Sequence, residues 1–275
     1  TVRQLRTRLC LRAPCRLLCS TSTTVAEKRH GFPVAVSLHC QNTSQAVDFY
    51  RSLFPEWNFD GQSNTFHVRE SNDTEAHGTV SSNILDDNAD STWIPTFIVE
   101  DKVGAESIIV SAGGQTSITS DGVPQNQSLC RDPHGGYFIV EERSTERRLK
   151  DSGWSAMPPP GAINWLDSCA NGEPKGPDGS GAGEETLADF YAKAFTLDVK
   201  QQFPFPGGTY ILGFTRNGYT NGDKLCGFLP AAPLIGQGSP SQWLSFFAVK
   251  DEEDLKARAA TAQKLSDNVQ VLLDI

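Results

Sequence analysis

Apolar residues follow helical spacing in some segments of the chain and strand-like spacing in others, and these segments alternate in a repeated order. Apolar positions at helical spacing predict one helix over residues 43–54, which Pro55 ends, and another over about 184–195. A strand-like segment precedes each helix, at residues 33–39 and 162–169. The pattern therefore predicts two units that each begin with a strand and a helix.

β-rich segments follow each of these helices, and after them each unit has a Trp-led strand and a further helix. The β-rich segments are expected at 65–69 and 78–84 in the first unit, and at 209–214 and 225–229 in the second. The further helices are expected over 102–112 and 252–265. Three more strands, at 116–120, 127–131 and 137–142, complete the first unit.

Two pairs of similar segments indicate that the units are copies of one fold. AVDFYRSLF at 46–54 matches LADFYAKAF at 187–195, with an offset of 141 residues. WIPTFIVED at 93–101 matches WLSFFAVKD at 243–251, with an offset of 150 residues. Segments that recur in the same order at nearly equal offsets indicate a duplicated domain.

We therefore expect an α+β fold of two tandem domains, in which paired β-α-β-β-β modules form curved, cup-like mixed sheets. The expected bounds are 1–32 for a basic arm, 33–142 for the first domain, 143–160 for a linker and 161–275 for the second domain. The span from Trp93 to Glu142 takes 49 residues, and the same span from Trp243 would pass Ile275. The second domain is thus expected to lack its last two strands, so either the natural chain continues or another chain covers the open edge.

Charge is unevenly distributed along the chain. The formal net charge is −9, but residues 1–30 hold seven basic residues against one acid, which leaves −15 for the remainder. An acidic body argues against nucleic acid as a partner. No apolar run in the sequence approaches the ~18 residues that span a bilayer.

The arm is rich in Arg, Leu, Ser and Thr, which is the composition of an organellar presequence. We expect mitochondrial targeting, with plastid targeting or a disordered basic tail as alternatives. Val2, Leu5 and Leu9 could share one face of a short helix that Pro14 ends. A segment this polar buries no core of its own, so if it is ordered we expect a protein partner to order it. The expected contacts are Arg3, Arg6, Arg8, Arg12 and Arg16.

Neither the cysteines nor the glycines form a ligand site in the sequence. Seven cysteines occur without a Cys-x-x-Cys pair or a Cys/His cluster at zinc spacing, which predicts free thiols. The glycine-rich insertion at 171–185 lacks a Gly-Lys-Ser/Thr sequence and a Gly-x-Gly-x-x-Gly after a strand. It therefore predicts a loop and not a phosphate site.

Three sequence motifs, taken in their order along the chain, resemble those of a known superfamily. They are Asp-Phe-Tyr in the first helix, Val-Glu-Asp after the mid-domain strand, and Asp-Pro-His-Gly-Gly-Tyr at 132–137 before the last strand. With the repeated β-α-β-β-β unit, they resemble the vicinal oxygen chelate superfamily, the group of glyoxalase I, bleomycin-resistance proteins and extradiol dioxygenases. The tandem arrangement resembles glyoxalase-like proteins of that group, over about 33–142 and 161–275.

In enzymes of this superfamily, the resemblance implies a metal held by His, Gln or Glu that stabilises an enediolate. Counted from the motifs, the ligand positions fall on Ala35, Ile94 and Ile139 in the first domain, and on Trp165 and Leu244 in the second. None of these side chains is a metal ligand. A slip of one or two residues restores no ligand set, since it gives Ser37, Trp93 and Val140 or Glu141. The nearest candidate for a fourth position is His77. We therefore expect neither a metal nor another cofactor.

Two polar residues remain as candidates for acid–base chemistry. His39 shares strand parity with Ala35, and Asp167 shares it with Trp165, so each is expected to point into a cup. The competing interpretation is a hydrogen-bonded polar residue of a cup-shaped sheet.

The sequence favours a metal-free glyoxalase-like protein that acts as an accessory or structural subunit of an organellar assembly. Protein partners are expected at the basic arm and at the open edge of the second domain. The alternatives are a module that binds a small apolar ligand in the cup, and a lyase or dioxygenase type of enzyme that acts on a small oxo substrate.

Overall fold

The structure is a computed structural model of the chain. It describes residues 8–12, 31, 33–68, 78–82, 91–118, 122–142, 160–170, 183–195, 197–205, 208–215, 224–230, 241–265 and 270–274. Most of the expected linker and of the glycine-rich insertion lies outside these residues, and the expected domain bounds stay a prediction.

The first half of the fold, residues 33–142, follows the predicted order of elements. Its first module is β2 (Pro33–Cys40), α1 (Thr43–Leu53), β3 (Trp57–Phe59), β4 (Thr65–Val68) and β5 (Gly78–Ser82). Its second is β6 (Thr92–Val99), α2 (Lys102–Ser111), β7 (Gln127–Arg131) and β8 (Tyr137–Glu142). The strand expected at 116–120 is wrong over 116–118, because the only pairing there is an isolated bridge from Gln115 to Arg131.

The second half repeats this order. Its first module is β9 (Ile163–Ala170), α3 (Gly183–Phe195), β10 (Leu197–Phe205), β11 (Gly208–Thr215) and β12 (Lys224–Pro230). Its second is β13 (Gln242–Ala248), α5 (Glu252–Leu265) and β14 (Gln270–Asp274). The sequence did not predict β10, whose pairing with β11 is interrupted by a bulge between Val199 and Gln201.

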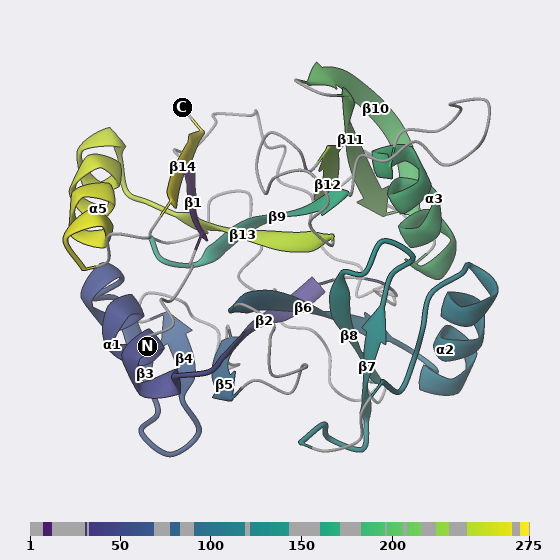
Figure 1. Ribbon diagram of the computed structural model, residues 1–275, viewed down its shortest axis with the longest axis horizontal. Coiled ribbons are helices and arrows are strands. Elements are labelled where there is room, and N and C mark those ends of the chain that lie inside the picture. The colour runs from purple at the N-terminus through teal and green to yellow at the C-terminus, as the bar shows by residue number, and fades with distance from the viewer. Residues whose placement is uncertain are drawn as a thin grey trace, which may run out of the picture.

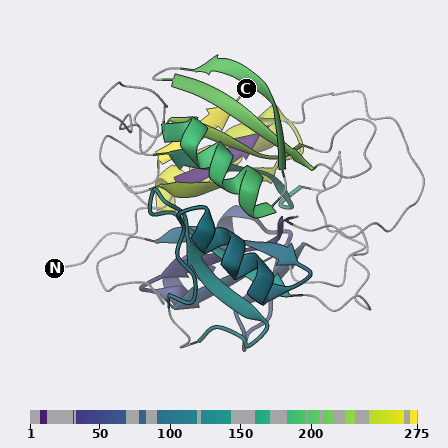
Figure 2. The same ribbon diagram turned by 90° about the vertical axis from the view of Figure 1, so that its right-hand side faces the viewer.

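The strands form one open mixed sheet, which confirms the predicted α+β class. The path runs β10-β11-β12-β9-β13-β6-β2-β5-β4-β3, and β8 joins β6. Within the sheet, the two halves are joined at a single antiparallel residue pair, Trp93 with Trp243. Figure 1 shows α1 and α5 together at one end of the molecule and α2 and α3 at the other. Turned by 90°, α3 lies above α2 in front of the strands (Figure 2). None of the helices described is long and apolar enough to cross a membrane.

The basic arm contributes a strand, which corrects two expectations. Residues Arg8–Arg12 form β1, so the short helix is wrong over this part of the arm. β1 pairs in parallel with β13 and β14 of its own chain, so these residues need no partner to be ordered. The reason is physical: an isolated short helix is marginal in water, whereas the edge of β13 offers backbone hydrogen bonds to an alternating Arg-Leu-Cys-Leu-Arg segment. Arg3, Arg6 and Arg16 lie outside the described residues.

Aromatic residues from the repeated motifs cross between the halves. Phe54, at the end of α1, packs on Phe247 of β13 with ring centroids 5.2 Å apart. Phe195, at the end of α3, stacks on Phe97 of β6 at 4.5 Å. In the repeat, Phe54 corresponds to Phe195 and Phe97 to Phe247. The two contacts are therefore copies of each other, as in a twofold interface between identical subunits.

Within each half, a second repeated contact fixes the first helix on the Trp-led strand. Tyr50 meets Trp93 edge-on at 5.4 Å, and Tyr191 meets Trp243 edge-on at 5.2 Å. All four rings are buried in the largest apolar cluster of the fold, which joins both halves. We call this cluster the aromatic seam.

A buried arginine ties α5 to the end of α1. The Nε of Arg258 donates to Asp254 Oδ1 and its Nη1 donates to the carbonyl oxygen of Leu53, each at 2.9 Å. Its Nη2 lies 2.9 Å from Glu56 Oε1, and the guanidinium lies over the Phe54 ring. The cation thus satisfies a carbonyl that the last turn of α1 leaves without a helical partner.

Replacing Arg258 by Ala should destabilise the protein by about 3 kcal/mol, because it leaves the Leu53 carbonyl and two partly buried carboxylates without their cation. The measurement is the free energy of unfolding in urea. Lys256→Ala is the matched control on the same helix, because its ion pair with Glu252 is exposed. Equal effects of the two substitutions would contradict this account of the contact between α1 and α5.

Candidate functional site

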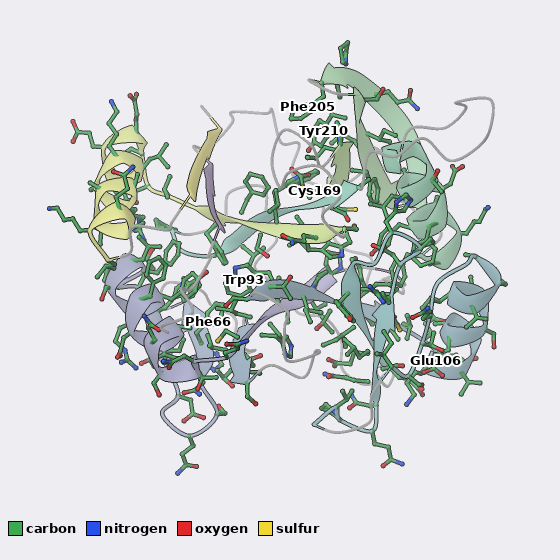
Figure 3. The ribbon with its side chains drawn as sticks, viewed as in Figure 1. Phe66, Trp93, Glu106, Cys169, Phe205 and Tyr210 are labelled. Carbon is green, nitrogen blue, oxygen red and sulfur yellow. The ribbon has the colours of Figure 1, made fainter. Side chains whose placement is uncertain are left out.

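Each half has a sheet face turned away from the helices, which we call its front face. Side chains on the opposite face join the aromatic seam, whereas front-face side chains form separate clusters. In the first half the front cluster is built on Ile94, Leu129 and Ile139. In the second half, Figure 3 shows Cys169, Phe205 and Tyr210 among β9–β12, away from Trp93 between the halves.

The front face of the first half has no metal-ligand set at the positions that the resemblance indicates. Ile94 and Ile139 are buried in the front cluster, and Ala35 is half-buried. The neighbouring polar pair is satisfied internally, because Thr79 Oγ1 donates to Ser37 Oγ at 2.9 Å. These side chains offer at most hydroxyl groups, which make a poor site for a divalent metal.

The alternative positions do not supply a ligand set either. Trp93 and Val140 lie in the aromatic seam, on the opposite side of the sheet. Glu141 is a buried carboxylate, and its Oε2 accepts a hydrogen bond from Gln127 Nε2 at 2.9 Å. In the described part of the chain, no group of three or more His, Cys, Asp or Glu side chains could hold a metal. His77 lies outside that part.

His39 lies on β2, buried, with only 4% of its surface exposed. Burial lowers the pKa of His39 to about 4, against a smaller opposing contribution from the backbone of Ser82. Apart from this contact with the Ser82 backbone, neither ring nitrogen has a hydrogen-bond partner among the described residues. The imidazole is therefore neutral at pH 7 and could accept a proton only at a free-energy cost.

Asp167 forms the main polar cluster on the front face of the second half. Trp165 Nε1 and the Tyr210 hydroxyl both donate to Asp167 Oδ1, at 2.6 and 3.0 Å. Leu244 pairs with Asp167 across the strands and is buried. Gly227 pairs with it on the other side, and a Cβ at Gly227 would collide with Asp167 and Tyr210. The cluster therefore depends on a residue without a side chain at position 227.

The chemistry of this cluster is limited by its surroundings. Leu212, Leu229 and Phe246 pack around it, so a ligand here would meet an apolar surface with one hydrogen-bonded carboxylate. The carboxylate is engaged within the cluster, because its Oδ1 already accepts two donors. Figure 3 shows Tyr210 beside Phe205 at this surface.

The buried cysteines are not nucleophiles. Cys40, Cys130, Cys169 and Cys226 are all free and buried, as predicted for these four. Burial raises the pKa of Cys40 to about 11 and that of Cys130 to about 12. Burial, with the charge of Asp167, also raises the pKa of Cys226. Thiols of this kind stay protonated and unreactive at neutral pH.

A further buried carboxylate lies where the halves meet. Asp132 Oδ1 accepts the backbone N–H groups of His134 and Gly136 at 2.8 and 2.9 Å. Its Oδ2 accepts the hydroxyls of Tyr191 at 3.1 Å and Ser241 at 3.4 Å, both from the second half. Burial raises the pKa of Asp132 to about 6 despite these four donors. The Asp-Pro-His-Gly-Gly turn is therefore a contact between the halves.

The two sequence candidates are not brought together. His39 lies on β2 and Asp167 on β9, and β6 and β13 separate these strands in the sheet order. Sequence reasoning missed Tyr210 and Gly227, which complete the Asp167 cluster. The signal for Gly227 was a glycine inside a strand-like segment, which often marks close approach of another group.

Comparison with known proteins finds similarity in structure alone. No family model and no curated protein matches the sequence. A variant of homoprotocatechuate 2,3-dioxygenase from B. fuscum has a TM-score of 0.52 at 13% identity, over 89% of this chain and 65% of that one. The 2,2',3-trihydroxybiphenyl 1,2-dioxygenase of Sphingomonas wittichii strain RW1 has a TM-score of 0.51 at 11% identity, over 86% and 79%.

A third similar structure is the Mn(II)-bound glyoxalase from Novosphingobium aromaticivorans. Its TM-score is 0.50 at 13% identity, over 86% of this chain and 71% of that one. These structures have the vicinal oxygen chelate fold, and so does this chain, which confirms the fold that the motifs indicated. At such low identity the similarity extends to the fold and not to the reaction.

Replacing His39 by Leu should flatten the acid side of the stability profile. The pKa of His39 is about 4 in the folded state and ~6.5 when unfolded, so the unfolded chain binds the proton first. Stability is therefore lost as pH falls from about 6.5 to 4, by up to about 3 kcal/mol. The measurement is the free energy of unfolding in urea at pH 4–7.

Asp132→Asn is a control for which the opposite dependence of stability on pH is expected. The pKa of Asp132 is raised to about 6, so its ionisation removes stability as pH rises from about 4 to 6. The His39 variant should gain relative stability at low pH, and the Asp132 variant should gain it at high pH. The same change of slope in both variants would contradict the assigned environments.

Proposed function

We propose that this chain is a metal-free glyoxalase-like protein that serves as an accessory subunit of an organellar assembly, mitochondrial rather than plastid. The observation that carries the proposal is the composition of the two front faces. Where the superfamily's enzymes hold a metal, this chain has Ala35, Ile94, Ile139, Trp165 and Leu244. These residues do not fit a divalent cation, so we derive no reaction step through one.

The retained fold supports a role other than catalysis. The aromatic seam and the Asp132 turn hold the halves together through several buried contacts. We infer that a chain with this packing, and with no ligand set at the positions given above, uses the framework of the fold without its metal chemistry. A framework of this kind offers surfaces to other proteins.

The charge distribution supports an organellar setting with protein partners. Residues 1–30 have the composition of a presequence, and the remainder carries −15. We propose that partners contact the arginines of the arm, including Arg3, Arg6 and Arg16, and the edge of the sheet at β14. The acidic body argues against nucleic acid as a partner.

The proposal predicts the size and the metal content of the native protein. In a gently lysed mitochondrial extract, the chain should migrate in native gels well above its own 29.9 kDa, because it is held by partners. Raised salt should weaken that association, because the proposed contacts are made by charged arginines and salt screens charge interactions. The chain purified from the same extract should hold far less than one Mn, Fe, Ni or Zn per molecule by mass spectrometry.

Two outcomes would count against this proposal. Migration near 30 kDa in every extract would reject the accessory role. One tightly held metal per chain, which survives dialysis and is lost on unfolding, would restore the enzymatic alternative.

A further inference from the structure

β1 occupies the same place in the second half that β8 occupies in the first. β8 is the parallel neighbour of β6, with Ile139 opposite Thr96 and Val140 opposite Phe97. β1 is the parallel neighbour of β13, with Cys10 opposite Phe246 and Leu11 opposite Phe247. Thr96 and Phe97 correspond to Phe246 and Phe247 in the repeated segments. The two strands therefore match in neighbour, direction and register.

The sequence of β1 suits this register. Leu9 and Leu11 hold the positions that Phe138 and Val140 hold in β8. Both of those β8 residues are wholly buried on the helix side of the sheet. Arg8, Cys10 and Arg12 take the alternate positions. An alternating segment with leucine at the two core positions is what a strand at this place requires.

β1 is also held on its second edge. Its five residues pair in parallel with β14, from Arg8 opposite Gln270 to Arg12 opposite Asp274. We call the space between β13 and β14 the strand slot. Every other described strand of the second half comes from residues 163–274, whereas the occupant of the slot comes from the other end of the chain.

A strand that arrives from a remote segment is held partly by its covalent tether. Residues 13–32 connect β1 to β2, and a tether of this kind gives its end an effective concentration on the order of millimolar. If the tether is cut, β1 becomes an ordinary ligand and competes on equal terms with any other strand. Cutting within residues 1–30 is what removal of a presequence would do.

We propose that the strand slot is a docking site for an extended segment, which β1 fills until the arm is cut and which a partner protein's strand then takes. The partner strand has leucine-like residues at two alternate positions and a basic residue on either side of that pair, as β1 does. Backbone hydrogen bonds from β13 and β14 supply affinity, and the two core positions supply specificity. The acidic body favours a basic strand.

The test is peptide exchange in the full chain. A site for a specific protease is placed within residues 13–30, and the folded protein is cut so that both pieces remain present. The probe is a fluorescent peptide that copies residues 5–14. Its binding is followed by fluorescence anisotropy, and release of the original arm is followed by native mass spectrometry.

The cut chain should bind the peptide at least about a hundredfold more tightly than the uncut chain, because the tether no longer favours β1. The control peptide carries Leu9→Pro and Leu11→Pro and should not bind, because proline has no N–H for the ladder. The uncut chain with Leu11→Pro should bind the unmodified peptide without any cleavage. This variant keeps the test decisive if the cut arm dissociates slowly.

Three outcomes would overturn the proposal. The cut chain and the uncut Leu11→Pro chain could both exclude the peptide, which would mean that the slot does not exchange. The proline peptide could bind as well as the unmodified one, which would mean that binding does not use the ladder. Cut chains could pair into dimers that exchange arms, which would assign the slot to a second copy and not to a partner.

This inference rests on the proposed accessory role only for the identity of the occupant. Peptide exchange is measured on the isolated chain, so it can succeed even if the chain always migrates alone in extracts. That combination would retain the strand slot and reject the accessory role. The reverse combination, a large native assembly with no exchange, would place the partner elsewhere on the molecule.

Discussion

The crossed packing of Phe54 on Phe247 and of Phe195 on Phe97 is the contact on which the rest of the structure depends. Each half ends its first helix with a buried phenylalanine that packs on an aromatic ring of the other half. The helix side of each sheet is apolar for the same reason, and it becomes the interior of one shared core. Burial of large aromatic side chains makes the largest contributions to such a core. The front faces are consequently turned outward, one on each half.

This arrangement explains why the sequence was informative about the fold. Periodicity located α1, α2, α3 and α5 because each helix has one face against the shared core. The repeats located the duplication because Tyr50 and Tyr191, or Phe97 and Phe247, make the same contact twice. Because both copies need the same aromatic contacts, both have the same residues at these positions.

The remaining features could not be predicted, because they depend on residues that only the fold brings together. β1 is a five-residue segment whose neighbours lie at the opposite end of the sequence. Arg258 donates to Leu53, a residue 205 positions away in the sequence, and a polar residue on a helix gives no sign of such a partner. On the front face of the second half, the direction of Asp167 could be predicted from its strand parity. Its dependence on Tyr210 and Gly227 could not be predicted. A local sequence pattern indicates which face of a helix or strand is buried, but it does not indicate which remote residue that face contacts.

The separation between the buried helix side and the front face of each sheet also bears on function. The buried seam keeps the vicinal oxygen chelate fold, while the front faces carry isoleucine, leucine and hydrogen-bonded polar groups where a metal would need ligands. Stability and chemistry reside on opposite sides of each sheet, so one can be lost while the other is kept. The structure is a framework whose second half takes a strand from the arm. This is the physical basis for proposing a role in assembly.

The central claim is that the two halves form one unit through the crossed aromatic contacts. The most direct measurement is a double-mutant cycle of Phe97→Leu and Phe195→Leu in urea unfolding, followed by tryptophan fluorescence. The account predicts one cooperative transition in every variant and a coupling energy of about 0.5–1.5 kcal/mol between the two positions. Two separate transitions with additive effects of the substitutions would contradict it.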